Sequence, residues 1–141
     1  MENQKIKRLD FDTVALSKDG KALVIIDQTL LPGEMRFIEL SKQSDIREAI
    51  YKLKVRGAPA IGVAAAIGIY LAALEISQST EEEAAFFERL QEAKAYLQAA
   101  RPTAVNLKWA LDRMFRFAES KKGAGVKEIV RLMRTEAERM R

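Results

Sequence analysis

The 141-residue chain contains neither cysteine nor histidine. It therefore offers no thiolate nucleophile, no imidazole base and no Cys/His zinc site, which leaves Asp, Glu, Lys and Tyr for any acid–base chemistry. Aromatic residues make up only 7% of the chain, and its 24 basic and 20 acidic side chains are interspersed. A basic surface with interleaved aromatics, as nucleic-acid binding requires, is therefore not indicated.

Length and composition predict one soluble globular domain over residues 1–141. The chain is 48% hydrophobic and 31% charged, and a domain of this size buries roughly two-thirds of its unfolded surface. Residues 1–8 lead to no early apolar segment, so no secretory signal is indicated and a cytoplasmic location is expected. The acidic run Glu81–Glu83 suits the first turn of a helix better than a metal site, and no metal or organic cofactor is expected.

The longest uncharged stretch is Gly57–Leu74. Its eighteen residues are just long enough to span a membrane, but they include three Gly and seven Ala, with Pro59 near the start. Small residues recur at helical spacing at Gly62 and Ala66, and again at Gly68 and Ala72, forming flat strips that other elements can approach closely. We therefore predict a central helix buried within the domain.

The start of this predicted helix has two possible interpretations. Gly57 can form a cap or tight turn, and Pro59 suits a first helical turn because its missing N–H would be unpaired there. Free backbone N–H groups and the positive end of the helix dipole, beside Arg56, would then form an anion-binding site, most naturally for phosphate. Alternatively, Arg56 is a solvated or ion-paired residue at an ordinary helix start.

The N-terminal third predicts a small antiparallel sheet. Leu9–Leu16, Ala22–Asp27 and Met35–Leu40 have the apolar or alternating patterns of strands. Lys18–Lys21 and Leu31–Glu34 supply the turns between them. Three strands with one apolar face need helices to cover that face.

From about residue 44 onward the apolar spacing becomes helical. Ser44 or Asp45 is expected to cap the first helix, and a capping box (Thr80 with Glu83, or Ser79 with Glu82) the helix after the central one. Pro102 is expected in the first turn of the next helix, and Val126 begins the apolar face of the last one. The chain is therefore predicted to be an α+β domain, with a three-stranded sheet followed by a bundle of about five helices.

Arg101 repeats the setting of Arg56, because each immediately precedes a short segment with a proline at a predicted helix start. If the two helix starts converge, two guanidinium groups and several backbone N–H groups would surround one phosphate. Charge-assisted hydrogen bonds of this kind contribute about 1.5–3 kcal/mol each.

Three segments carry a resemblance to a known family. They are Ile26-Asp27-Gln28 with Leu31-Pro32, then Leu53–Gly62, and then Arg101-Pro102-Thr103-Ala104-Val105-Asn106-Leu107. Together they resemble the N-terminal domain of methylthioribose-1-phosphate isomerase, an aldose–ketose isomerase of methionine salvage. This family shares a superfamily with ribose-1,5-bisphosphate isomerase and with the alpha, beta and delta subunits of translation initiation factor 2B. The resemblance extends over nearly the whole chain, from Leu9 to Arg141.

The resemblance implies a division of labour between two domains. Arg56 and Arg101, with Gly57 and Ala58 through their backbone, would hold the phosphosugar. The family's catalytic Cys and Asp belong to a second, Rossmann-like domain, and neither that domain nor any Cys is present in this sequence. The chain is therefore expected to contain no catalytic residue and to show little turnover alone. A fragment or split gene product is expected, completed by the missing domain or a partner chain and homodimeric at full length.

Two alternatives accompany this interpretation. The chain resembles the initiation factor 2B subunits as well, so it could be a regulatory or scaffold module that acts through protein–protein contacts. It could also belong to the ribose-1,5-bisphosphate isomerase branch. Neither alternative predicts nucleic-acid or membrane binding.

Overall fold

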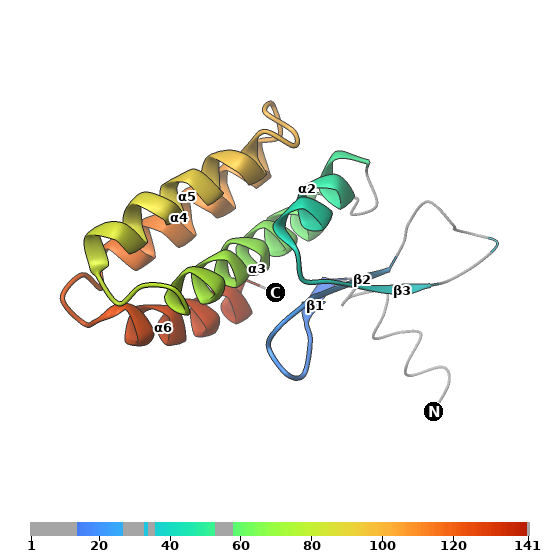
Figure 1. Cartoon of the computed structure of the whole chain (residues 1–141). Helices are drawn as coiled ribbons and strands as arrows, with labels where there is room; N and C mark the ends of the chain where they lie inside the picture. Colours follow the sequence, from blue (N-terminus) through green and yellow to red (C-terminus); the bar gives the residue numbers. More distant parts are fainter. Residues whose placement is uncertain (1–13, 27–32, 34–35, 53–57, 141) are drawn as a thin grey trace.

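The structure, a computed structural model, describes residues 14–26, 33, 36–52 and 58–140. Within these residues a three-stranded sheet is followed by five helices, so the predicted α+β class is confirmed (Figure 1). The strands are β1 (Val14–Leu16), β2 (Leu23–Ile26) and β3 (Phe37–Leu40), and the helices are α2 (Gln43–Tyr51), α3 (Ala58–Ser77), α4 (Glu83–Gln98), α5 (Val105–Glu119) and α6 (Val126–Arg139).

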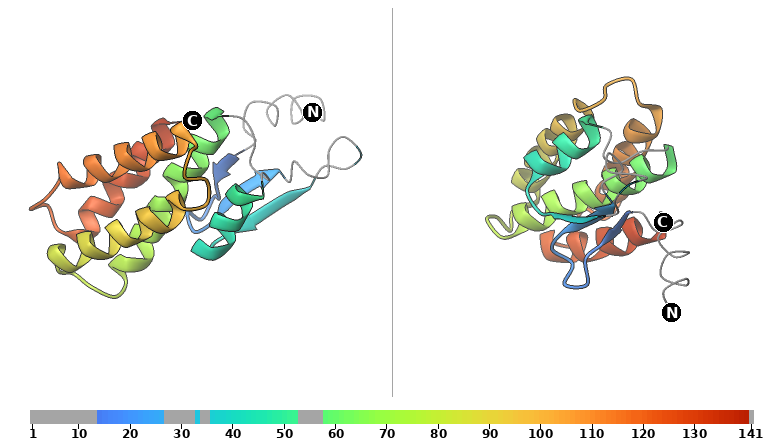
Figure 2. Two further views of the ribbon diagram at one scale, coloured as in Figure 1. Left: turned by 90° about the horizontal axis from the view of Figure 1, so that it is seen from above. Right: turned by 90° about the vertical axis from the view of Figure 1, so that its right-hand side faces the viewer.

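The sheet is an antiparallel meander in the order β1-β2-β3, with Val14 opposite Ile25 and Ile25 opposite Ile38. The predicted turn between β1 and β2 is confirmed. The Asp19 carboxylate accepts hydrogen bonds from the Ser17 hydroxyl at 2.6 Å and the Lys21 N–H at 3.0 Å, and Gly20 adopts a φ of 73°. The sheet lies beside one end of the helical bundle (Figures 1 and 2).

Helix α3 is the centre of the domain, as predicted. Mean hydropathy over Pro59–Ser77 is 1.9, enough for a membrane-spanning helix, but 67% of that window is buried inside the domain. The other helices and strands β1 and β2 pack around it. The prediction that Pro59 lies in the first turn is also confirmed, because α3 begins at Ala58.

The helices after α3 alternate in direction. Gly68 of α3 lies beside Leu97 of α4, and Ile76 lies near Arg89, so these two helices are antiparallel. Helix α5 then runs back beside α4, with Lys94 bonded to Asp112 at 2.7 Å. Consequently α3 and α5 run in the same direction and begin at the same end of the bundle (Figure 1).

Two predicted helix caps are wrong. Helix α2 begins at Gln43, and its N-cap is Lys42 without a side-chain hydrogen bond. The Lys42 carbonyl already accepts the Asp45 N–H at 3.1 Å, so Ser44 and Asp45 lie inside the first turn. In the same way α4 has Glu82 as its N-cap without a side-chain bond, so neither predicted capping box forms.

The Glu83 side chain instead joins α4 to the loop before α6. Its carboxylate accepts the N–H of Gly123 at 2.8 Å and the N–H of Gly125 at 2.9 Å. Both glycines have positive φ, 98° and 96°, which orients their N–H groups toward one carboxylate. Because Gly125 is the N-cap residue of α6, Glu83 satisfies a helix terminus from a distant part of the chain.

Asp112 links α4 and α5 through two lysines. Its carboxylate contacts the Lys108 and Lys94 ammonium groups, each at 2.7 Å. The hydrogen bond from Lys108 and, to a smaller extent, the one from Lys94 lower the pKa of Asp112 from 3.8 to about 2. Stability from this group is therefore fully present above about pH 4, where the unfolded chain is also ionised, and is lost as the pH falls through about 2.

We expect Asp112→Asn to reduce the free energy of unfolding at pH 7 by about 1 kcal/mol, because it removes the charge that the two lysines stabilise. The effect stays this small because Lys108 is largely exposed and water screens its charge. The difference from the wild type should narrow as the pH falls from about 4 to about 2, since the wild-type carboxylate then becomes protonated. Urea unfolding of both proteins across this range measures it. A difference that stays constant with pH would show that Asp112 stabilises the fold without its charge.

Candidate functional site

The starts of α3 and α5 lie against one another. A Cβ atom placed on Gly62 would be 3.8 Å from the backbone oxygen of Asn106 and 3.9 Å from the Cβ of Ala110. Gly62 is one turn into α3, and Asn106 is the second residue of α5. Because the two helices are parallel, the positive ends of their dipoles lie at the same end of the bundle.

Arg101 lies in the turn that leads into α5. Its backbone N–H donates to the Gln98 carbonyl at 3.3 Å, and its own carbonyl accepts the Ala104 N–H at 3.0 Å. The side chain is half-buried and forms no hydrogen bond or ion pair with any residue that the structure describes. Its guanidinium group is thus not neutralised by a carboxylate of the described part of the chain.

The start of α5 differs from the prediction. The helix begins at Val105, so Pro102 lies in the preceding turn and not in the first helical turn. The reason is the bond from Ala104 to Arg101, which closes a separate turn before the helix starts. Ala104 is the N-cap and has no side-chain oxygen, so this residue does not cap the helix, and no other described side chain is bonded to its first N–H groups. The first N–H groups of α5 therefore resemble a typical anion-binding helix terminus.

Of the other three predicted binding residues, the structure describes only Ala58. Arg56 and Gly57 lie outside the described residues. Ala58 is the first residue of α3, and its backbone therefore belongs to the helix terminus that faces the start of α5. The structure thus brings the backbone of Ala58 and the turn containing Arg101 to one end of the bundle.

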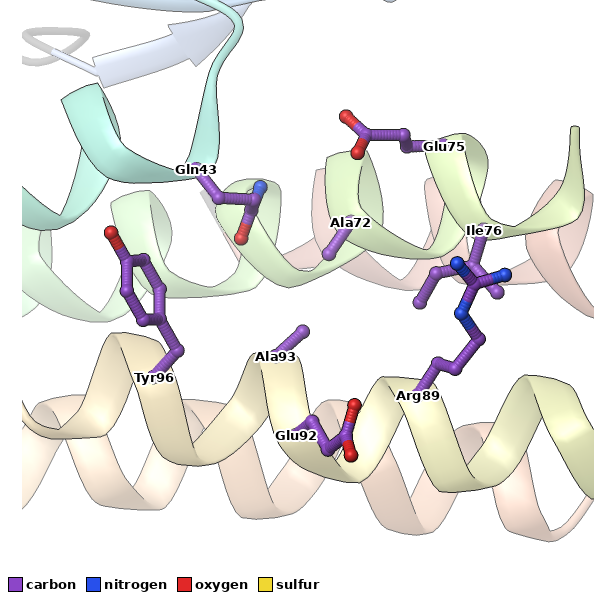
Figure 3. Close-up of a pocket in the computed structure, with 8 residues that line it drawn as sticks. All are labelled: Gln43, Ala72, Glu75, Ile76, Arg89, Glu92, Ala93 and Tyr96. Atoms are coloured by element: carbon purple, nitrogen blue, oxygen red, sulfur yellow. The ribbon is translucent and has the colours of Figure 1, made fainter. Parts of the chain in front are cut away.

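A groove of about 340 Å³ lies elsewhere, between α2, α3 and α4, and Figure 3 labels the residues that line it. Glu75 and Glu92 form no ion pair within the described residues, and the one basic lining residue, Arg89, donates to the Ser79 hydroxyl. Two carboxylates against one occupied guanidinium do not suit an anion. This groove is therefore a poor candidate for binding a phosphate.

Gln43 at the end of this groove was not singled out from the sequence. Its side-chain nitrogen donates to the Gly68 carbonyl at 2.9 Å, whereas its side-chain oxygen is buried without a partner among the described residues. A glutamine at a helix start gives no pattern that distinguishes this role from a solvated side chain. The hydrogen bond from Gln43 joins α2 to the middle of α3, and Figure 3 shows the Gln43 side chain directed toward α3.

Within the described residues, one end of the helical bundle has a helix start without a side-chain cap and an arginine, Arg101, without an ion-pair partner, which is consistent with an anion-binding domain. Residues 54–141 match the model of the initiation factor 2 subunit family. The chain therefore belongs to this family, and the resemblance inferred from the sequence is confirmed.

Its relatives include methylthioribose-1-phosphate and 5-deoxyribose 1-phosphate isomerases. The chain is 47% identical over 130 residues to a methylthioribose-1-phosphate isomerase of Symbiobacterium thermophilum, covering 92% of this chain and 36% of that protein. It is 46% identical over 127 residues to a 5-deoxyribose 1-phosphate isomerase of Petrotoga mobilis, covering 90% and 36%. The chain thus spans about a third of the length of these relatives.

Solved structures show the same fold. The 5-methylthioribose 1-phosphate isomerase of Pyrococcus horikoshii OT3 superposes with a TM-score of 0.83 at 38% identity, over 91% of this chain and 35% of that one. The delta subunit of translation initiation factor eIF-2B from A. fulgidus superposes with a TM-score of 0.77 at 37% identity, over 91% and 36%. Enzymes and initiation factor subunits therefore share this domain.

Proposed function

We propose that the chain is the phosphosugar-binding N-terminal domain of an aldose–ketose isomerase that acts on 5-methylthioribose 1-phosphate. The observation that carries this proposal is that the starts of α3 and α5 lie against one another, since a Cβ on Gly62 would be 3.8 Å from the Asn106 oxygen. Beside them, Arg101 forms no ion pair with any residue that the structure describes. Arg56 and Arg101 would neutralise the phosphate, and the backbone N–H groups of Gly57 and Ala58 would complete its binding site. The names of the isomerase relatives support this substrate class.

The contribution of this domain to catalysis is positioning. A phosphate held between arginines and helix termini fixes the sugar, so that acid and base groups can act on C1 and C2 of the opened ring. Those groups would come from a second domain or a partner chain, because the relatives are about three times as long. The complete protein would work as a cytoplasmic homodimer, without a metal or organic cofactor, and this chain alone would show little turnover.

Loss of the Arg101 guanidinium should weaken phosphosugar binding. We expect Arg101→Ala to raise the Kd for 5-methylthioribose 1-phosphate at least tenfold, since a charge-assisted hydrogen bond contributes about 1.5–3 kcal/mol. Arg116→Ala is the matched control, because it removes the same charge from the last turn of α5, away from the site. Nuclear magnetic resonance titration of the 141-residue chain measures both values. Equal affinities for wild type and Arg101→Ala would contradict the assignment.

A second candidate function is a regulatory or scaffold module. The superposition on the eIF-2B delta subunit favours it, because that protein shares the fold and 37% of the aligned residues. This candidate predicts tight association with a protein partner and weak or no phosphosugar binding by the wild-type chain. The same titration therefore separates the two functions.

A further inference from the structure

The groove between α2, α3 and α4 presents hydrogen-bond acceptors on both of its sides. Glu75 stands on the α3 side and Glu92 on the α4 side, and neither carboxylate is bonded to another described residue (Figure 3). The one basic lining residue, Arg89, donates to the Ser79 hydroxyl. Carboxylates only accept hydrogen bonds at neutral pH, so the groove suits a ligand that donates them and carries positive charge.

Gln43 adds a third acceptor, inside the groove. Its side-chain nitrogen donates to the Gly68 carbonyl at 2.9 Å, and because a carbonyl can only accept, this bond fixes which end of the amide is the oxygen. The oxygen is directed away from that bond, toward the α4 side of the groove (Figure 3). It is buried and has no partner among the described residues. Such an acceptor is costly, and a donor bound in the groove would remove the cost.

The floor of the groove selects the shape of the ligand. Ala72, Ile76 and Ala93 make it apolar, and its volume of about 340 Å³ is small for a ligand site. Tyr96 lies at the Gln43 end and is 40% exposed, so rotation of its side chain opens a path to the buried oxygen. Arg89 at the other end would repel a second positive group (Figure 3). The groove therefore suits one cationic group on a short alkyl chain.

We propose that this groove binds a short primary alkylamine in its ammonium form. The ammonium group has three donors and no acceptor, so it can donate to the Gln43 oxygen while the carboxylates of Glu75 and Glu92 attract its charge. The alkyl chain covers the apolar floor, which a hydrated metal ion would not. Because the ligand contacts three helices, it also stabilises the folded domain. This ligand is additional to the phosphosugar of the proposed function, and neither depends on the other.

The probe that tests this proposal is n-butylammonium, and n-butanol is its uncharged counterpart of equal chain length. In a nuclear magnetic resonance titration of the 141-residue chain at constant ionic strength, n-butylammonium should shift the Gln43 side-chain amide signals saturably. The Kd for n-butanol should be about tenfold higher, because charge-assisted hydrogen bonds are lost. If n-butylammonium gives no saturable shift, or n-butanol binds as tightly, the groove is not an amine site.

Two variants of α4 locate the ligand. Ala93→Leu should abolish the saturable shift because the larger side chain fills the floor, whereas Ala95→Leu, at an exposed position of the same helix, should not. Glu92→Gln should raise the Kd for n-butylammonium about threefold, the effect of one exposed charge. Glu119→Gln removes the same charge from the exposed end of α5 and should change nothing. Thermal unfolding checks that each variant is folded. Equal effects of each variant and its control would show non-specific binding and overturn the proposal.

Discussion

Gly68→Leu should be strongly destabilising, lowering the free energy of unfolding by about 4 kcal/mol. A Cβ on Gly68 would already lie 3.2 Å from the Ile46 methyl carbon and 3.4 Å from a methyl carbon of Leu97. Both neighbours are fully buried, so they have no solvent space to move into. The three further carbons of leucine would push α2 and α4 away from α3 and break the bond from Gln43 to the Gly68 carbonyl.

Urea unfolding of Gly68→Leu and Gly68→Ala measures this effect. The alanine variant adds only the Cβ, and its better helix propensity, about 1 kcal/mol, offsets much of the close contact. We therefore expect Gly68→Ala to differ from the wild type by less than about 1 kcal/mol, or by less than a quarter of the loss in Gly68→Leu. A leucine variant as stable as the alanine variant would show that α2 and α4 can move apart freely at this position.

The sequence predicted that α3 is a core helix which its neighbours approach closely. An uncharged stretch with small residues at helical spacing predicts a core helix that neighbours approach closely, and Gly62 and Gly68 are at such approaches. The sequence could not assign the partners. Gly68 faces two bulky side chains of α2 and α4, whereas Gly62 faces the backbone and a small side chain of α5, and that difference depends on tertiary packing.

The wrong caps have a common physical cause. Local patterns place Thr80 with Glu83 in a capping box, but the Glu83 carboxylate finds two N–H groups forty or more residues away, at Gly123 and Gly125. Likewise the start of α5 is moved past Pro102 by a backbone turn. Short-range rules describe which groups need partners, and only the assembled fold decides which partners they meet.

The candidate anion site remains a prediction, because two of its four residues, Arg56 and Gly57, lie outside the described part of the chain. The repeated Arg and Pro at two expected helix starts suggested a shared anion site, and the parallel course of α3 and α5 supports that suggestion for the described Arg101.

The spacing of α3 and α5 at Gly62 should control ligand binding as well as stability. We expect Gly62→Leu to lower the free energy of unfolding by about 3 kcal/mol and to abolish measurable phosphosugar binding. A Cβ fits there, at 3.8 Å from the Asn106 oxygen, but the larger branch of leucine would meet the α5 backbone and displace the first turn of that helix. Arg101 and Asn106 would move with it.

Gly62→Ala separates the two effects. Its Cβ makes ordinary contacts with Asn106 and Ala110, so the variant should be more stable than the wild type by up to about 1 kcal/mol and bind 5-methylthioribose 1-phosphate equally well. Urea unfolding and calorimetric titration of both variants give the two quantities. If Gly62→Leu remains folded and binds like the wild type, the ligand does not depend on the distance between the two helix starts, and the site must lie elsewhere in the protein.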